Sequence, residues 1–138
     1  MKVYLAGGVH KLTGQQATEW RKEATKKLEA MDFKVIDPLR GRNLSDKGLI
    51  SDSEDAINVN SVVVRAKFDV NNADIILAEM MDTSRPYVGT SMEIYQAWQQ
   101  DKPIITWSTY DNSFLKYHST AMFDNLADCI DFIAAEYK

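Results

Sequence analysis

Short apolar runs alternate with amphipathic stretches along this chain of 138 residues. The apolar runs predict strands over residues 3–6, 33–36, 75–78, 104–105 and, more weakly, 120–123. Apolar residues at helical spacing predict a helix after residue 13 and others over about 56–70, 91–100 and 124–137, with a helical turn over 114–119. This alternation is typical of an α/β fold whose parallel sheet is covered by helices.

The segment over residues 73–107 organises the expected fold. Two apolar runs flank a polar loop and a helix, and together they indicate a βαβ unit with parallel strands. In open parallel sheets, ligands bind outside the carboxyl ends of the strands. The loop over residues 80–90 and the first turn of the following helix are therefore expected to border a ligand site.

Glu93 is the strongest single candidate for chemistry in this segment. We expect Thr90 or Ser91 to cap the helix, which would place Glu93 in the first turn, where the helix dipole favours an ionised carboxylate near neutral pH. Trp98 lies on the face expected to pack on the sheet, whereas Glu93 lies off it and can point into the crevice. Such a carboxylate can attack an electron-poor carbon, although acidic first turns that only decorate a helix are more common.

Other candidates lie near the ends of the first two predicted strands. Gly7 and Gly8 allow close approach of a ligand, but the loop lacks the pattern of a P-loop or a complete dinucleotide fingerprint, so no dinucleotide cofactor is indicated. On the helix that follows, Trp20 is expected in the core and Arg21 on another face.

A long polar stretch, residues 39–55, follows the second predicted strand. Arg40 and Arg42 are candidates for binding an anion, and a solvated loop explains them equally well. Asp69 falls near the end of the next predicted helix, where it is a candidate acid/base partner of Glu93.

The composition and charge of the chain exclude several classes of protein function. The formal net charge of −4 argues against nucleic acid as the main partner. The two histidines have no metal-ligand spacing, so no metal site is expected. The single cysteine, Cys129, rules out an internal disulfide, and no apolar run suits a signal peptide or a membrane span. We expect a cytoplasmic protein with one domain over residues 1–138.

Four motifs together resemble the nucleoside 2-deoxyribosyltransferase family, including its 2′-deoxynucleoside 5′-phosphate N-hydrolase branch. They are the initial VYLAGG, the IDP that follows the second strand, ADIILAE, and GTSMEI followed by Ala97. The resemblance implies a flavodoxin-like three-layer sandwich with a central parallel sheet of about five strands. We expect no cofactor. It also implies a glutamate that attacks the anomeric carbon of the sugar and expels the base. Glu93 matches that glutamate, and Tyr4 matches a tyrosine that positions it.

Two positions depart from the family pattern. Ala66 stands where the family usually has an aspartate, and Asp69, one turn later, is the candidate replacement. Tyr87 stands where the transferases have an aspartate that contacts the base and the phosphate-using branch has a small hydroxylated residue.

The resemblance leaves nucleoside and 5′-monophosphate substrates open. The candidate substrate-binding residues are Gly7, Gly8, His10, Arg40, Tyr87, Gly89, Ser91 and, from a neighbouring subunit, Ser119. Further phosphate donors would be Lys11, Arg42, Ser84 and Arg85. Because the family completes its sites across a dimer interface, we expect a homodimer or larger homo-oligomer.

The expected function is cleavage and transfer of the N-glycosidic bond of a small-molecule 2′-deoxynucleoside. The alternatives are hydrolysis of a 2′-deoxynucleoside 5′-monophosphate and a non-catalytic nucleotide-binding module. A flavin-binding protein of flavodoxin type is a further alternative.

Overall fold

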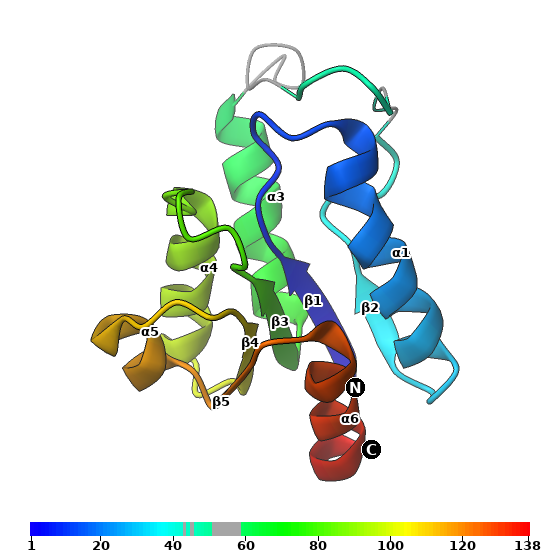
Figure 1. The fold of residues 1–138 in the computed structure, drawn as a ribbon. Coiled ribbons are helices and arrows are strands. Elements are labelled where there is room, and N and C mark those ends of the chain that lie inside the picture. Colours follow the sequence, from blue (N-terminus) through cyan, green and yellow to red (C-terminus); the bar gives the residue numbers. More distant parts are fainter. Residues whose placement is uncertain (43, 45, 51–58) are drawn as a thin grey trace.

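A five-stranded parallel sheet forms the centre of the protein in a computed structural model, which describes residues 1–42, 44, 46–50 and 59–138 (Figure 1). The strand order is β2-β1-β3-β4-β5, and every neighbouring pair is parallel. The strands are β1 (Lys2–Ala6), β2 (Lys34–Ile36), β3 (Ile75–Glu79), β4 (Ile104–Trp107) and β5 (Ala121–Phe123). The helices are α1 (Gly14–Glu29), α3 (Val59–Asn72), α4 (Val88–Gln99), α5 (Ser113–His118) and α6 (Leu126–Tyr137).

The helices cover both faces of the sheet, so the fold has three layers (Figure 1). Successive side chains of a strand point to opposite faces. Val3 and Leu5 of β1 therefore pack in one core with residues of α1 and α6. Tyr4 and Ala6 pack in the other core with residues of α3, α4 and α5. The predicted flavodoxin-like α/β sandwich is confirmed.

Strands buried on both faces must be apolar throughout, which explains the continuous apolar runs. β3 pairs with β1 on one side and β4 on the other, and Ile75 through Ala78 have no exposed surface. Trp20 and Cys129 are buried, as predicted. Among the described residues, no helix is both long and apolar enough to cross a membrane.

The boundaries of two helices differ from the prediction. α4 begins at Val88, three residues earlier than expected, because Tyr87 adopts the left-handed region (φ 48°) and serves as the N-cap residue. Neither Thr90 nor Ser91 caps the helix. α3 is described from Val59 and reaches Asn72, and the predicted start of that helix lies outside the described residues. Trp98 is 38% exposed and stacks on Tyr95, so its predicted packing on the sheet is wrong.

Candidate active site

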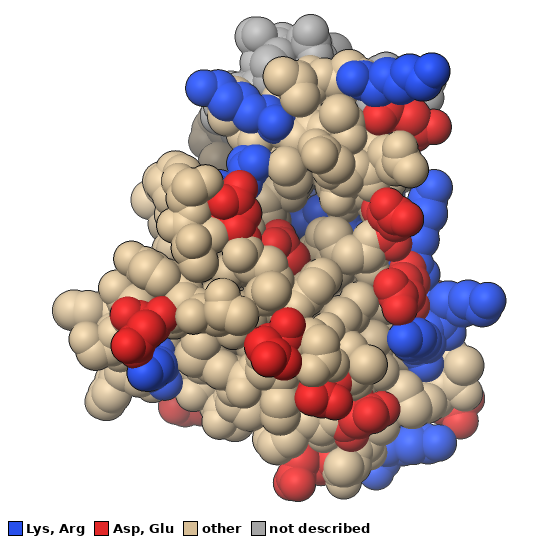
Figure 2. All heavy atoms as spheres, viewed as in Figure 1, with Lys and Arg blue, Asp and Glu red and all other residues tan. Residues whose placement is uncertain are grey.

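The carboxyl ends of β1 and β3 form the topological switch point of the sheet. From β1 the chain passes to β2 on one side, and from β2 it returns to β3 on the other side of β1. A crevice opens between such diverging connections, and in α/β proteins ligands bind there. Figure 2 shows the surface hollowed between α1 and α4 above the ends of these strands, with basic and acidic atoms visible inside.

Two loops meet across this edge. The Gly8 position packs against the second loop, since an added Cβ would lie 2.9 Å from Arg85 Cδ and 3.2 Å from Tyr87 Cε1. Arg85 Nη1 donates a hydrogen bond of 2.5 Å to the carbonyl oxygen of His10. The loop after β1 and the loop after β3 are therefore held together, and a side chain at residue 8 would have to displace Arg85.

Glu93 lies in the second turn of α4, because the helix begins at Val88. The predicted first-turn position, and ionisation favoured there by the helix dipole, are therefore wrong. The side chain is half-buried, and its Oε2 atom is buried without a hydrogen-bond partner among the described residues. A buried carboxylate oxygen with no donor is uncommon in proteins and marks a candidate functional group.

Burial raises the pKa of Glu93 from 4.5 to about 7. Hydrogen bonding by the Tyr4 hydroxyl and the charge of Arg21 lower this pKa, while the charge of Asp69 raises it. Near neutral pH the Glu93 carboxyl group therefore exchanges between its protonated and ionised forms, and the ionised form increases as the pH rises. A carboxyl group with a pKa near the working pH is typical of active sites.

Tyr4 is held in the centre of the sheet and forms a hydrogen bond with Glu93. It sits in β1 between Ile36 of β2 and Ile76 of β3 and is 1% exposed. Burial and the neighbouring Glu93 carboxylate raise the pKa of the Tyr4 phenol well above its usual value of 10. Tyr4 therefore stays protonated and can donate a hydrogen bond to Glu93.

Asp69 and Arg40 form a bidentate ion pair. Arg40 Nη1 and Nη2 donate to the two oxygens of Asp69 at 2.7 and 2.8 Å, and Nη1 also donates to the carbonyl oxygen of Asp37 at 3.0 Å. Asp69 is 3% exposed, whereas the side chain of Arg40 is 44% exposed. The hydrogen bonds that Arg40 donates to Asp69 raise the pKa of Arg40. The sequence offers no link between these two residues, and the fold brings them together.

Tyr87 is buried, and its hydroxyl group joins the end of β3 to the loop that follows it. Its hydroxyl donates to Glu79 Oε1 at 2.9 Å and accepts from the backbone N–H of Asp82 at 3.1 Å. Burial raises the pKa of Tyr87 above its usual value. Ser84 Oγ donates to Asp82 Oδ1 at 2.6 Å, so it is engaged within its own loop.

The remaining predicted residues are spread around the site. Gly89 is exposed, with open space where a Cβ would lie, and Ser91 is exposed on α4. The backbone N–H of Lys11 donates to the Ile50 carbonyl oxygen at 2.7 Å. Ser119 precedes β5, at the opposite edge of the sheet, and its hydroxyl bonds with Thr106 Oγ1 and the Leu115 carbonyl oxygen, each at 2.7 Å. Its contribution to a neighbouring subunit stays a prediction.

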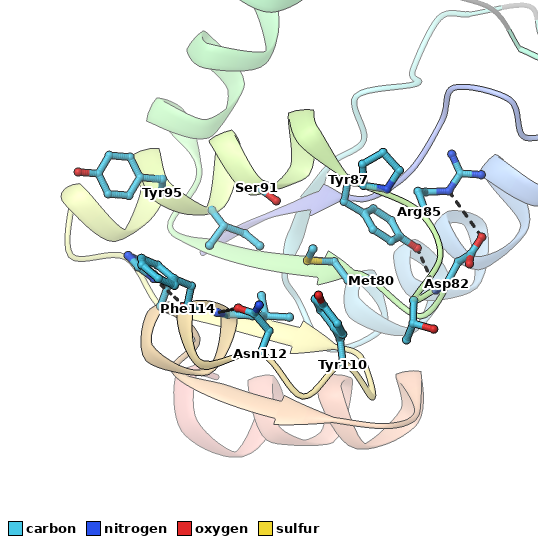
Figure 3. A pocket seen from close by; sticks show the side chains of 14 residues that line it. Met80, Asp82, Arg85, Tyr87, Ser91, Tyr95, Tyr110, Asn112 and Phe114 are labelled. Carbon is cyan, nitrogen blue, oxygen red and sulfur yellow. Dashed lines mark hydrogen bonds and ion pairs between the residues drawn. The ribbon is translucent and has the colours of Figure 1, made fainter.

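A cavity of about 320 Å³ lies between α4 and α5. Tyr87 and Arg85 lie on one side of it, and Tyr110 and Asn112, from the loop after β4, lie on the other (Figure 3). Ser91 lines this cavity and Glu93 does not. The two residues are separated by about 200° around the helix, so the cavity and the carboxylate lie on different faces of α4.

A second cavity, of about 390 Å³, lies between α1 and the ends of β3 and β4. Its lining includes Glu79, Trp20 and Trp107, and again not Glu93. The Glu93 carboxyl group and its neighbours Tyr4 and Asp69 therefore lie outside the lining of both cavities. In the described part of the chain, no cluster of three or more His, Cys, Asp or Glu side chains is arranged to hold a metal ion.

Arg21, which has no exposed surface, was not among the predicted site residues. It was expected on a polar face of α1 beside Lys22. In fact it falls on the buried stripe formed by residues 17, 20, 24 and 28, three and four residues from its neighbours. That spacing can be read from the sequence, but a basic side chain is normally expected on an exposed face.

Fold and site together define a doubly wound α/β protein with a half-buried carboxyl group, Glu93, near its switch point, an arrangement suited to a small-molecule enzyme. The profile of the family described as nucleoside 2-deoxyribosyltransferase matches residues 3–127, and the chain belongs to this family. It is therefore an enzyme that acts on N-glycosidic bonds.

Solved structures show the same fold at low sequence identity. A 2-deoxyribosyltransferase from Bacillus psychrosaccharolyticus is 18% identical with a TM-score of 0.72, covering 95% of this chain and 91% of that chain. A 2-deoxyribosyltransferase from Leishmania mexicana is 17% identical with a TM-score of 0.64, covering 99% of both chains. The CMP N-glycosidase BcmB of Clostridium botulinum is 15% identical with a TM-score of 0.59, covering 96% of this chain and 98% of that chain. No curated protein sequence matched.

Proposed function

We propose that the protein cleaves the N-glycosidic bond of a 2′-deoxynucleoside through a covalent glycosyl intermediate on Glu93 and transfers the sugar to a second base or to water. The observation that carries this proposal is the Glu93 carboxyl, half-buried at the crevice with one oxygen lacking any donor among the described residues. An unsolvated carboxylate oxygen is a stronger nucleophile toward carbon than one held by several hydrogen bonds.

The reaction has two displacements at the anomeric carbon. In the first, a carboxylate oxygen of Glu93 bonds to that carbon while the carbon–nitrogen bond breaks, and the base leaves with the electron pair and takes up a proton. In the second, the nitrogen of another base or the oxygen of water bonds to the same carbon and loses a proton, and Glu93 leaves as a carboxylate. The transition states resemble an oxocarbenium ion, which an adjacent carboxylate stabilises.

Tyr4 and Asp69 have supporting roles in this proposal. The Tyr4 phenol orients the Glu93 carboxyl by donating a hydrogen bond. Asp69 is the group proposed to supply the proton to the leaving base. Both Asp69 oxygens accept hydrogen bonds from Arg40, so this role requires the substrate to open the ion pair. Arg40 is exposed enough to turn toward a ligand when it does so.

A 5′-monophosphate substrate is the second candidate, favoured by the start of α4. No side chain caps this terminus, and Gly89 leaves its first turn open. Uncapped backbone N–H groups at a helix N-terminus bind phosphate well. Under this candidate, water is the acceptor and the products are deoxyribose 5-phosphate and free base. Either form of the enzyme is proposed to act as a homodimer or larger homo-oligomer.

Chromatographic detection of free base tests the proposal. The wild-type protein is incubated with deoxynucleosides and their 5′-monophosphates, each with and without a second base. Base release, or exchange of one base for the other, is expected with the wild type and not with Glu93→Ala. Glu136→Gln, an exposed substitution on α6, is the matched control and should retain full activity. Nucleotide binding without base release would instead identify a non-catalytic module, and unchanged activity in Glu93→Ala would refute the assigned nucleophile.

A further inference from the structure

Arg21 is a fully buried cation beside the crevice, and the proposed reaction has not yet given it a role. Its exposure is 0%, although arginine is rarely buried without a carboxylate partner. Nη1 donates to the carbonyl oxygen of Ala17 at 2.5 Å, one turn earlier in α1. Nε lies 3.8 Å from Asp37 Oδ1, which is too long for a hydrogen bond. Nε and Nη2 have no hydrogen-bond partner among the described residues.

This placement is unfavourable for folding. A buried guanidinium loses its hydration, and incomplete pairing leaves much of that cost uncompensated. Burial accordingly lowers the pKa of Arg21. An apolar side chain would fit the same stripe of α1, between Ala17 and Leu28, without this cost. Arg21 Cζ lies 4.7 Å from the centroid of the Trp20 ring, and this cation–π contact offsets only part of the desolvation cost. Function is therefore the more economical explanation for a cation at this position.

The guanidinium is directed toward the edge of the sheet that carries the site. A Cβ added at Gly7 would lie 3.2 Å from Nη2, so the loop after β1 passes directly over the guanidinium. Four acidic or phenolic groups from four elements interact with its charge: Asp37 after β2, Glu79 of β3, Tyr4 of β1 and Glu93 of α4. The cation thus sits at the carboxyl ends of β1, β2 and β3, close to Gly7, Asp37 and Glu79.

We propose that Arg21 is a positioning residue whose buried guanidinium, placed behind the loop that follows β1, keeps the Glu93 carboxylate in its charged and reactive form. The inference rests on the proposed function of Glu93 as the nucleophile. It assigns Arg21 no contact with substrate, because a side chain without exposed surface cannot reach one.

The charged groups around Glu93 determine in which direction the loss of Arg21 shifts the pKa of Glu93. Glu93 is faced by Tyr4 from β1, Arg21 from α1 and Asp69 from α3. Burial and Asp69 favour the protonated form, whereas Tyr4 and Arg21 favour the carboxylate. Arg21 is the one cation among these groups, so its removal shifts the balance toward the unreactive acid. Asp37, at 3.8 Å from Nε, partly neutralises Arg21 and thereby weakens its effect on Glu93.

The first test compares pH–rate profiles of base release for the wild type, Arg21→Met and Arg21→Lys. Methionine has a similar length and no charge. Its profile should rise at a pH higher by about one unit or more, because an opposite charge commonly shifts a carboxyl pKa by that amount. At pH 6 this is roughly a tenfold loss of rate, while the plateau at high pH stays near the wild-type value. Lysine should restore part of the shift, and Lys22→Met, which removes the adjacent exposed charge, should leave the profile unchanged.

In the second test, the pH–rate profile of base release should shift to lower pH. Asp37→Asn removes the negative charge nearest Arg21 but keeps an oxygen that can accept the hydrogen bond from the backbone N–H of Leu39, 2.9 Å long with aspartate. The unscreened cation should then shift the rise of the profile to lower pH. Opposite shifts in Arg21→Met and Asp37→Asn are difficult to obtain from a purely structural role of either residue.

A titration without substrate separates this inference from the proposed function. The ¹³C carboxyl resonance of Glu93, assigned by its loss in Glu93→Gln, reports its pKa directly. The pKa should rise in Arg21→Met and fall in Asp37→Asn even if the protein releases no base from any substrate tried. An unchanged Glu93 titration in folded Arg21→Met would overturn the inference. If Arg21→Met does not fold, an unchanged titration in Asp37→Asn would overturn it equally.

Discussion

Replacement of Glu93 by glutamine should stabilise the protein at alkaline pH while abolishing its activity. In the wild type, the folded state holds the carboxylate in a buried position, and the unfolded chain exposes it to water. The pKa of Glu93 is 4.5 in the ordinary exposed state and about 7 in the folded protein. Each pKa unit corresponds to about 1.4 kcal/mol, so a difference of roughly 2.5 units makes ionisation in the folded state cost about 3 kcal/mol.

The sign of the pH dependence follows from proton binding. Between pH 4.5 and pH 7 the folded state binds more protons at Glu93 than the unfolded state does. The contribution of this group to the free energy of unfolding therefore falls as the pH rises through that range. Below it the carboxyl group is protonated in both states, and above it the full cost is present. The stability of Glu93→Gln relative to the wild type should thus increase by about 3 kcal/mol between pH 4 and pH 8.

Urea unfolding at several pH values measures this difference. Comparison between pH values cancels any constant difference in packing between glutamine and glutamic acid. Glu136→Gln, on the exposed face of α6, should show no such pH-dependent gain. An advantage of Glu93→Gln that is the same at pH 4 and pH 8, or that shrinks as the pH rises, would refute the conclusion that burial dominates the electrostatics of Glu93.

Two further predictions concern groups around the nucleophile. Tyr4→Phe removes a hydrogen bond to Glu93, so the pH–rate profile of base release should rise at a higher pH than in the wild type. The loss of rate should be larger at pH 6 than at pH 9. A uniform loss at all pH values would contradict this role. Gly7→Ala should cost about 1–3 kcal/mol in urea unfolding, because the new Cβ would lie 2.9 Å from Trp20 Cζ2 and 3.2 Å from Glu79 Cβ. Gly89→Ala, in open space on α4, should fold at least as stably as the wild type, and equal losses in both variants would show that the close approach at Gly7 is unimportant.

The pattern of apolar runs was sufficient to predict a parallel α/β sheet, and the family resemblance added the flavodoxin-like three-layer sandwich. Residues 75–78 form an uninterrupted apolar run, which only a strand covered on both faces requires, and four more such runs alternated with helical spacing. Glu93 was identified because it follows one of these strands in a motif that resembles a known family. These features are local, so they can be recognised without knowledge of the tertiary contacts.

The environment of Glu93 could not be predicted in the same way. The start of α4 depends on the left-handed backbone of Tyr87, whose hydroxyl is engaged by Glu79 and the backbone of Asp82. This moves Glu93 from the first turn to the second, away from the uncompensated end of the helix. Burial then raises the pKa of Glu93, and burial is a property of the packed protein rather than of any segment.

Arg21 and Asp69 show the same limit. The sequence by itself determined that Asp69 falls near the end of α3, but the prediction from sequence placed Arg21 on a face away from the apolar stripe of α1. The tertiary structure alone decided that Arg21 is fully enclosed and that Asp69 is paired with Arg40, 29 residues away in the chain. Periodic patterns record which face of an element is buried, whereas the electrostatics of a site depends on charges that folding brings together from distant segments.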